Sequence, residues 1–177
     1  MGRRAFAIAG TLVFLVLAPG TVAGLVPWWL TGWRMREPLL SAAPLRWVGA
    51  ALILAGLAVL LESFARFALR GAGTPAPVFP TERLVVTGLF RHVRNPMYCA
   101  VTAMILGQGL LLGDTRLLAY GAAVWLAFHL FVLLYEEPTL KGTYGPEYAA
   151  YRAAVPRWIP RIRPWRGGSA GQAQDAS

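Results

Sequence analysis

Charged residues are scarce in this chain of 177 residues, at 14% of the sequence, against about 25% in a soluble domain. Hydrophobic residues make up 56%, and the mean hydropathy is +0.51. These values favour an integral membrane protein over a soluble domain. Cysteine is almost missing, because Cys99 stands alone. An intramolecular disulfide, a CxxC redox motif and a thiolate metal site are therefore excluded, and we expect no metal.

Acidic residues are also few, with 8 Asp and Glu against 17 Lys and Arg, for a formal net charge of +9. Such an excess is often found in nucleic-acid-binding proteins. Here the positive residues flank apolar runs and do not form one basic patch, so we expect no nucleic-acid partner. Membrane topology explains their distribution better.

Four apolar runs predict four membrane-spanning helices, over residues 6–30, 45–69, 97–112 and 117–135. A straight helix needs roughly 20 apolar residues to cross the bilayer core. The third run is shorter, so we expect it at a thinned or cavity-lined place. The first run continues past Pro19 and exceeds the roughly 7–15 residues of a signal-peptide core, which favours a span bent at that proline. The expected fold is all-α: a polytopic helical bundle within a single domain, 1–166, and a disordered tail, 167–177.

Lys and Arg are distributed unevenly about these spans. Twelve lie at the N-terminus, in the 70–96 loop or after the fourth span, and four lie on the opposite side. The positive-inside rule then predicts a multi-pass protein of the cell membrane with both termini in the cytoplasm. Membrane lipids are expected partners. The predicted aromatic belt on the outer side consists of Trp28, Trp29, Trp33 and Trp47.

A first polar stretch, GLFRHVRNPMY, lies ahead of the third span. Asn95 precedes a proline, so its backbone is expected outside the helical region, and Pro96 suits the first helical position. Arg94 and Asn95 would then lie beside the free N–H groups of the helix start, a place suited to a carboxylate or phosphate, with Tyr98 one turn further in. The alternative is an ordinary interfacial anchor.

A second polar stretch begins with two adjacent carboxylates, Glu136 and Glu137. We expect them to close the fourth span, because Pro138 breaks the helical hydrogen bonding at Leu134. Carboxylates are disfavoured at a helix C-terminus, so these two need cations or a function. Consecutive helical residues point about 100° apart, so one can face a cavity while the other faces an arginine. The alternative is a solvated helix end.

The same stretch continues into a predicted short amphipathic helix. Pro146 suits its first turn and Pro156 ends it. Tyr148, Tyr151 and Arg152 share one face through their i, i+3, i+4 spacing. We interpret this helix as a lid over a cavity, and the alternative is a helix that rests on lipid headgroups.

Two further groups carry weaker signals. Glu62 and Arg66 lie one turn apart near the end of the second span, and a simple ion pair explains them. His129 lies within the fourth span, where it either lines the cavity or is hydrogen-bonded to a neighbouring helix.

Together these motifs resemble the isoprenylcysteine carboxyl methyltransferase family and its relatives, small integral membrane methyltransferases that include phospholipid and small-thiol methyltransferases. The family signature is an RHPxYxG-like motif, an apolar hairpin, EExxL and a G-x-x-Y-x-x-Y-like segment ending in proline. The resemblance covers about residues 82–162.

The chain departs from the signature at Asn95, where the family has His, and at Ala100, where it has Gly. Asn exchanges no proton near neutral pH, and His92 is a candidate to compensate. The matching residues are Arg94, Asn95, Pro96, Tyr98, Glu136, Glu137, Leu140, Gly145, Tyr148 and Tyr151.

The resemblance implies S-adenosyl-L-methionine as methyl donor, bound at the cytosolic end of the last two spans, and a lipophilic acceptor such as an isoprenylcysteine carboxylate, a lipid or a small thiol. The sequence has no Gly-rich strand-to-helix turn of the soluble nucleotide-binding folds, so helix ends and the C-terminal segment must build the site. The candidate catalytic residues are Glu136, Glu137 and Arg152. The candidate cofactor-binding residues are His92, Arg94, Asn95, Pro96, Tyr98, Leu140, Tyr148 and Tyr151.

Two other functions fit the composition. One is a small four-span transporter of cationic compounds with Glu62 or Glu136 as its charge site, although a transporter typically places such a carboxylate near the midplane. The other is a non-catalytic membrane adaptor that presents its basic tail to anionic lipids. The sequence does not determine the oligomeric state.

Overall fold

The computed structural model describes residues 13–69, 84 and 86–166. Every regular element in these ranges is helical and none is a strand, which confirms the all-α prediction. The predictions for the tail, 167–177, for residues 6–12 of the first span and for most of the loop between the second and third spans fall on residues outside those described. In chain order the elements are the π-turn η1 (Thr21–Leu25), α2 (Val26–Thr31), the 3₁₀ turn η2 (Leu39–Ser41), α3 (Pro44–Leu69), the 3₁₀ turn η3 (Gly88–Arg91), α4 (Pro96–Leu112), α5 (Thr115–Phe131), the π-turn η4 (Val132–Glu136) and α6 (Glu137–Ala154).

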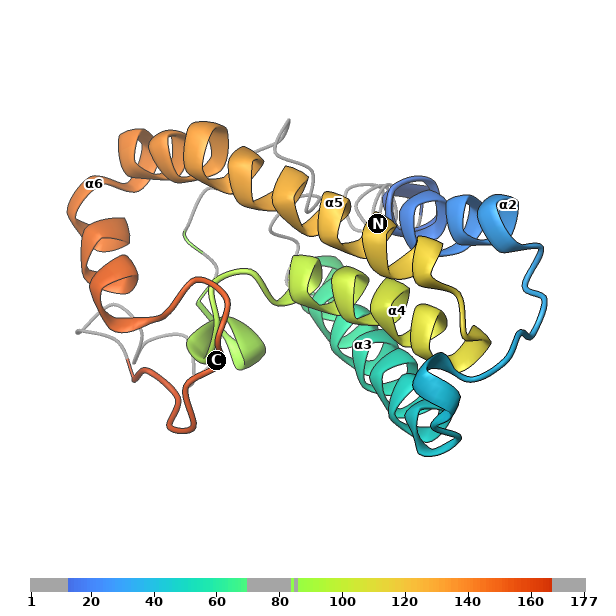
Figure 1. The fold of residues 1–177 in the computed structure, drawn as a ribbon. Helices are drawn as coiled ribbons and strands as arrows, with labels where there is room; N and C mark the ends of the chain where they lie inside the picture. The colour runs from blue at the N-terminus through green and yellow to red at the C-terminus, as the bar shows by residue number, and fades with distance from the viewer. Residues whose placement is uncertain (1–12, 70–83, 85, 167–177) are drawn as a thin grey trace.

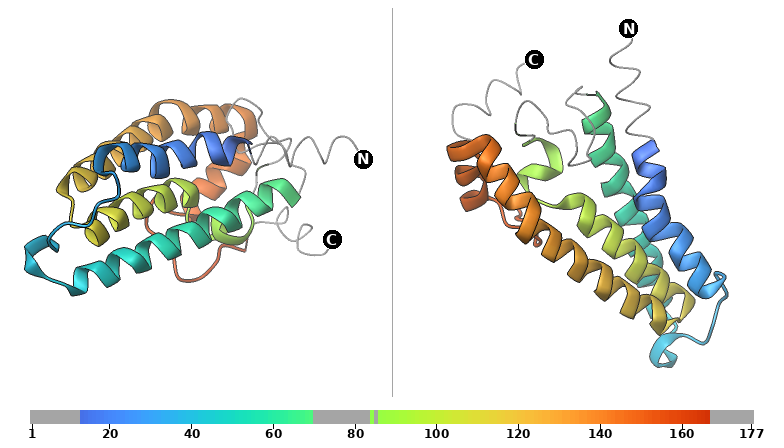
Figure 2. Two further views of the ribbon diagram at one scale, coloured as in Figure 1. Left: turned by 90° about the vertical axis from the view of Figure 1, so that its right-hand side faces the viewer. Right: turned by 90° about the horizontal axis from the view of Figure 1, so that it is seen from above.

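Within the described ranges, three helical stretches are long and apolar enough to cross a membrane, and α4 is a shorter apolar helix beside them. The long stretches are Val13–Thr31, Pro44–Arg66 and Thr115–Ala154. The predicted tryptophan belt is exposed, as contact with lipid requires: the exposed fractions lie between 50% at Trp28 and 80% at Trp47. In Figures 1 and 2 the helices α2, α3, α4 and α5 lie side by side, and α6 projects beyond one end of this bundle.

The helices α3 and α4 approach each other closely because small residues line their contact. A Cβ atom added to Gly49 would lie 2.5 Å from the Gly107 carbonyl oxygen, and one added to Gly56 would lie 2.8 Å from that of Ala100. Small residues let helix backbones pack tightly within a bilayer, where the hydrophobic effect does not drive association. Ala100 is 2% exposed, so an alanine is accommodated where the family signature has glycine.

Side chains of α4 and α5 bind the backbone of the first helix where the π-turn η1 leaves carbonyl groups available. The Gln108 amide donates to the Ala23 carbonyl oxygen at 2.7 Å, and the Tyr120 hydroxyl donates to that of Val22 at 3.0 Å. A π-turn shifts the helical hydrogen-bond register by one residue. The helix was predicted to bend near Pro19, and its irregular part, the π-turn η1, begins two residues later at Thr21. The carbonyl groups of this turn accept the hydrogen bonds from α4 and α5.

A tight turn joins α4 to α5. Gly113 adopts φ 72°, a left-handed conformation that glycine accepts without strain. Asp114 caps α5: its carboxylate accepts from the backbone N–H of Arg116 at 3.0 Å and from the Arg116 guanidinium at 2.7 Å. These hydrogen bonds, together with the nearby charge of Arg36, lower the pKa of Asp114 against the opposing effect of burial. The capped turn fixes α5 antiparallel to α4, which brings their other ends together.

The prediction that Glu136 and Glu137 close the helix is wrong. The helix passes from α5 through η4 directly into α6, and the Glu137 N–H donates to the Val132 carbonyl oxygen five residues earlier. Pro138 lies in the first turn of α6. Because the π-turn shifts the hydrogen-bond register just before this proline, its missing N–H does not end the helix. The carboxylates thus lie on a continuing helix, so the unfavourable C-terminal dipole does not act on them.

The chain bends at Gly145, whose φ of 48° and ψ of −120° are not helical. Helical structure resumes at Pro146 and ends at Ala154, which confirms the short C-terminal helix. Residues 156–166 then return as an irregular segment, which we call the return segment, to the N-terminal end of α4.

Candidate active site between α4, α5 and α6

The start of α4 is built as its sequence predicts. Asn95 has φ −121° and ψ 56°, outside the helical region, and Pro96 occupies the first turn. The Arg94 N–H donates to the Pro156 carbonyl oxygen at 2.9 Å, and the Asn95 side-chain amide donates to that of Arg157 at 3.2 Å. Both bonds attach the return segment to the entrance of α4. Asn95 is therefore buried as an anchor for this segment and does not point free into a cavity.

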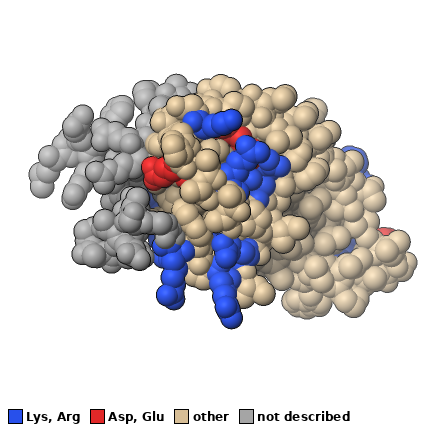
Figure 3. Space-filling view, turned by 90° about the vertical axis from the view of Figure 1, so that its left-hand side faces the viewer, with Lys and Arg blue, Asp and Glu red and all other residues tan. Residues whose placement is uncertain are grey.

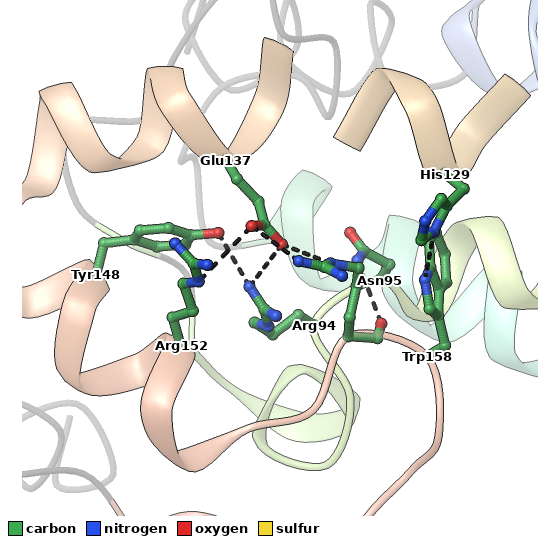
Figure 4. A network of polar contacts seen from close by, with 8 residues as sticks. Arg94, Asn95, His129, Glu137, Tyr148, Arg152 and Trp158 are labelled. Carbon is green, nitrogen blue, oxygen red and sulfur yellow. Dashed lines mark hydrogen bonds and ion pairs between the residues drawn. The ribbon is translucent and has the colours of Figure 1, made fainter. Parts of the chain in front are cut away.

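Glu137 is the centre of a network of arginines from three parts of the chain (Figure 4). Its Oε1 accepts from Arg94 Nη1 at 2.9 Å and from Arg157 Nε at 2.6 Å, while its Oε2 accepts from Arg157 Nη2 at 3.0 Å. Arg152 Nε lies 3.7 Å from Oε2. The bonds of Arg157 use two nitrogens and both oxygens, the bidentate geometry that makes Arg–carboxylate pairs strong. One carboxylate thus connects α4, α6 and the return segment.

Burial separates the roles of these arginines. The Arg94 side chain is 9% exposed, that of Arg157 is 23% exposed, and that of Arg152 is 51% exposed. A buried charge without a partner is strongly destabilising, so Arg94 depends most on Glu137. Its Nε atom is buried and has no hydrogen-bond partner among the described residues. The hydrogen bond to Glu137 raises the pKa of Arg157 above its ordinary value.

Glu136 belongs to a separate pair. Its Oε2 accepts from the Tyr98 hydroxyl at 2.9 Å, and the Tyr98 ring stacks on Phe128 with centroids 4.6 Å apart. Among the described residues, only Tyr98 is hydrogen-bonded to Glu136. The two adjacent carboxylates therefore have different partners, as the 100° offset predicts.

Tyr148 and Tyr151 pack inward and hold α6 against η3. They are 2% and 4% exposed and pack with Leu84 and Val155, and with Leu140 at the edge of the cluster. The Tyr148 hydroxyl accepts from Arg94 Nη1 at 3.2 Å, and the Tyr151 hydroxyl donates to the Phe90 carbonyl oxygen at 2.7 Å. In this structure the short helix is already closed onto the site.

The two histidines fix the return segment. His92 Nδ1 lies 2.8 Å from the Arg161 carbonyl oxygen, and the Arg161 N–H donates to the His92 carbonyl oxygen at 3.0 Å. His129 Nδ1 accepts from Trp158 Nε1 at 3.0 Å, as Figure 4 shows. An indole N–H only donates, so Nδ1 of this histidine carries no proton and its Nε2 does. The sequence left open a bond from His129 to a neighbouring helix, but its partner Trp158 belongs to the irregular return segment.

The structure brings most of the predicted residues together. Arg94, Glu137, Tyr148 and Arg152 form one network, and Tyr98 with Glu136 forms a second pair joined to it through the adjacent glutamates. The contacts of Asn95, His92 and Tyr151 are instead to backbone carbonyls. Pro96 starts α4 and Leu140 packs against the tyrosines. The predicted pair of Glu62 and Arg66 is also present, on α3.

Sequence reasoning missed Arg157 and Trp158 as members of the site. The adjacent carboxylates indicated that cations were needed, but not which ones. Arg157 lies 20 residues after Glu137 and comes close only because the chain bends at Gly145 and again after Ala154.

Fold and site define a class: a helical protein with apolar membrane-spanning stretches and a buried charged network at one end of them. Residues 45–147 match the model of the family described as phospholipid methyltransferase, which is more than half of the chain. The chain belongs to this family. The matched residues include α3, α4, α5 and the carboxylates Glu136 and Glu137.

The chain is also similar to a curated protein, the Protein-S-isoprenylcysteine O-methyltransferase of Schizosaccharomyces pombe (strain 972 / ATCC 24843). The two are 34% identical over 80 residues, which is 45% of this chain and 34% of the relative. The alignment thus spans about a third of the relative's length.

Proposed function

We propose that this protein is an S-adenosylmethionine-dependent methyltransferase that transfers a methyl group to a lipophilic acceptor at the cytosolic face of the membrane. The observation that carries the proposal is the network around Glu137 with the adjoining Tyr98–Glu136 pair. Its two carboxylates lie within the matched family region, at the end of apolar helices. Charged groups at such a place are costly and are retained mainly for function.

The residues present fit the charges of the proposed donor, which carries a carboxylate, an ammonium group and a sulfonium whose methyl group is transferred. In the part of the chain that the structure describes, the buried Nε of Arg94 has no hydrogen-bond partner, and the half-exposed Arg152 lies 3.7 Å from Glu137. These groups suit the carboxylate. Glu136 supplies a negative charge for the cationic part, and Tyr98 fixes one of its oxygens.

The division of contacts suggests different roles for the two glutamates. Glu137 holds Arg94, Arg152 and Arg157 in place, so we assign it the positioning of the site. Glu136 is bound by a single hydroxyl of the described residues and is our candidate to orient or activate the acceptor. Much of the acceleration of an in-line methyl transfer can come from such positioning.

Asn95 takes a role that needs no proton transfer. Its side-chain amide donates to the backbone of Arg157, and an amide keeps this donor at every pH. The departure from the family's histidine is therefore compatible with a fixed anchor, and we assign no acid or base function to this position.

The surface of α5 supports an acceptor that arrives from the bilayer. Leu126, Leu130 and Leu134 are 51%, 46% and 76% exposed, and they precede Glu136 on the same helical stretch. A lipophilic molecule can reach the helix that carries Glu136 at such a surface without crossing water. The relative's name supports an isoprenylcysteine as acceptor and the family description supports a phospholipid, so both belong in the test.

The transporter reading has less support than the enzyme. Glu62 is paired with Arg66, and Glu136 lies at the end of the spans beside the arginine network. We retain the prediction that the protein is multi-pass with both termini in the cytoplasm, since this orientation puts the site where S-adenosylmethionine is available.

The test is methyl transfer in proteoliposomes with labelled S-adenosylmethionine, an isoprenylcysteine analogue and phospholipids, followed by extraction of the lipid phase. We expect label in one of these acceptors, and a loss of about 10²-fold or more with Glu136→Gln. The matched control is Glu147→Gln, an exposed glutamate on α6, which should keep wild-type activity. Label in no acceptor, with a folded protein, would refute the proposal.

A further inference from the structure

The return segment exposes apolar side chains, and contact of such side chains with water is unfavourable. Ile159 is 78% exposed and Ile162 is 96% exposed. Between them and after them come positive residues, and residues 156–166 contain no Asp or Glu. Two nearly bare isoleucines beside Arg163 and Arg166, which are also exposed, form an amphipathic surface. Such a composition is typical of segments that lie in the membrane interface.

The isoleucines cannot turn inward, because the backbone of the segment is attached to the entrance of α4 on both sides of them. The Arg157 carbonyl oxygen accepts from Asn95, and the Arg161 N–H donates to the His92 carbonyl oxygen. Further on, the Trp165 N–H donates to the Arg91 carbonyl oxygen at 2.9 Å. The exposure is therefore a consequence of a fixed backbone conformation.

The contacts of Trp158 show where the return segment lies along the axis of the helical bundle. Its carbonyl oxygen accepts from Cys99 Sγ at 3.5 Å, and its indole donates to His129. Cys99 lies three residues into α4, which is about 4–5 Å along the axis, and His129 belongs to the apolar helix α5. Trp158 thus lies beside the apolar helices α4 and α5, and Figure 4 shows it next to His129. The segment then passes to His92 and Arg91, which precede α4. Ile159 follows directly in the chain, so it lies close to the start of α4.

We propose that residues 158–166 form an interfacial loop: Ile159 and Ile162 insert at the boundary of the acyl chains, and Arg163 and Arg166 bind the phosphate groups of anionic phospholipids in the same leaflet. Charge complementarity favours this partner, because the segment is purely basic and anionic headgroups attract such residues. Figure 3 shows Lys and Arg side chains gathered on the face at this end of the molecule, with few acidic ones.

An ion pair connects the return segment to the candidate active site. Arg157 is the second residue of the return segment and forms the bidentate pair with Glu137. Insertion of the following isoleucines would therefore hold the arginine network at a fixed depth relative to the leaflet. This inference concerns membrane contact and does not rest on the proposed reaction.

Site-directed spin labelling tests the depth. In a Cys99→Ser background, nitroxides are attached at Ile159→Cys or Ile162→Cys, and at Glu147→Cys as an exposed control on α6. After reconstitution, power saturation with oxygen and with a water-soluble nickel complex gives the depth of each label. We expect both isoleucine positions about 5–10 Å below the phosphates, and the control in water. Labels at both positions that are as accessible to nickel as the control would overturn the proposal.

Lipid composition tests the part played by the arginines. The depth at Ile162→Cys should increase when phosphatidylglycerol is added to phosphatidylcholine, and the change should vanish with Arg163→Gln and Arg166→Gln together. Equal depth in both mixtures would overturn the assignment to anionic lipids.

A measurement on the wild-type protein tests the same insertion without any variant, so its result does not depend on whether the variants fold. Hydroxyl-radical footprinting of the wild-type protein in liposomes should show Ile159 and Ile162 protected, despite their exposure in the protein itself. Oxidation of both at the rate of the denatured chain would contradict insertion. Loss of methyl transfer would leave all three results unaffected, so failure of the proposed function and failure of this proposal are distinguishable.

Discussion

Replacing Glu137 by Gln should destabilise the protein far more than any other single change at the site. The substitution keeps the shape but removes the negative charge that faces three arginines. Arg94, with a side chain 9% exposed, is then left buried with an uncompensated charge. The other two arginines are 23% and 51% exposed and can relax toward solvent.

Removing one partner of a buried ion pair costs about 3–5 kcal/mol. Because only Arg94 is deeply buried, we expect Glu137→Gln to lower the free energy of unfolding by about 3 kcal/mol, the low end of that range. For a chain of this size each kcal/mol shifts the melting temperature by about 2–4 °C, so we expect a fall of about 6–12 °C.

Cys99 provides the assay, because it is the single cysteine and lies half-buried against the return segment. A thiol-reactive fluorescent dye reports its exposure during thermal unfolding in detergent. The matched control is Arg152→Gln, which removes a half-exposed partner at 3.7 Å and should cost at most about 1 kcal/mol. Adding Arg94→Met to Glu137→Gln should cost less than the sum of the two single changes, because the stranded charge is gone. Equal, small shifts for Glu137→Gln and Arg152→Gln would refute this reasoning.

Two further predictions use the same unfolding assay, and a third is followed by tryptophan fluorescence during acid unfolding, because a thiol-reactive dye does not label cysteine at low pH. Gly113→Ala should destabilise by about 1–3 kcal/mol, because its φ is 72° and the new Cβ would clash with the Glu37 carbonyl oxygen. Gly142→Ala, with open space around it, should be neutral or stabilising, and the reverse order would contradict the turn geometry. Tyr120→Phe should cost about 0.6 kcal/mol, the average for an interhelical hydrogen bond in a membrane, and no change at all would mean that its bond to the π-turn η1 contributes nothing. The pKa of Asp114 is lowered by its arginine partners. Its contribution to stability should therefore be present above its unfolded pKa of about 3.9 and be lost as the pH falls from there through the lower folded pKa. Asp114→Asn should flatten this acid dependence, and a wild-type acid dependence in the variant would contradict the assignment.

Local signals in the sequence were sufficient for the turn and for the start of α4. Gly113 and Asp114 specify a left-handed cap followed by a helix N-cap, and Pro96 after Asn95 specifies a helix start; these effects act within a few residues. The 100° offset between Glu136 and Glu137 predicted separate partners, and the structure has them.

Longer-range features of the site were not predictable in this way. Pro138 normally interrupts a helix, and only the π-turn η4, stabilised within a packed structure, lets the helix continue. The contacts of Arg157 with Glu137 and of Trp158 with His129 join residues 20 and 29 positions apart. They depend on the bend at Gly145 and on the path of the return segment, which no local pattern specifies.

Equilibrium binding of S-adenosylmethionine and S-adenosylhomocysteine to the purified protein tests the proposed donor site most directly. We expect saturable binding of both, weakened by Tyr98→Ala and by Glu136→Ala, and retained in Glu147→Gln. Because Tyr98 and Glu136 form their own pair outside the arginine network, these two variants should remain folded in the dye assay. No binding by a wild-type protein that unfolds cooperatively in that assay would contradict the methyltransferase proposal.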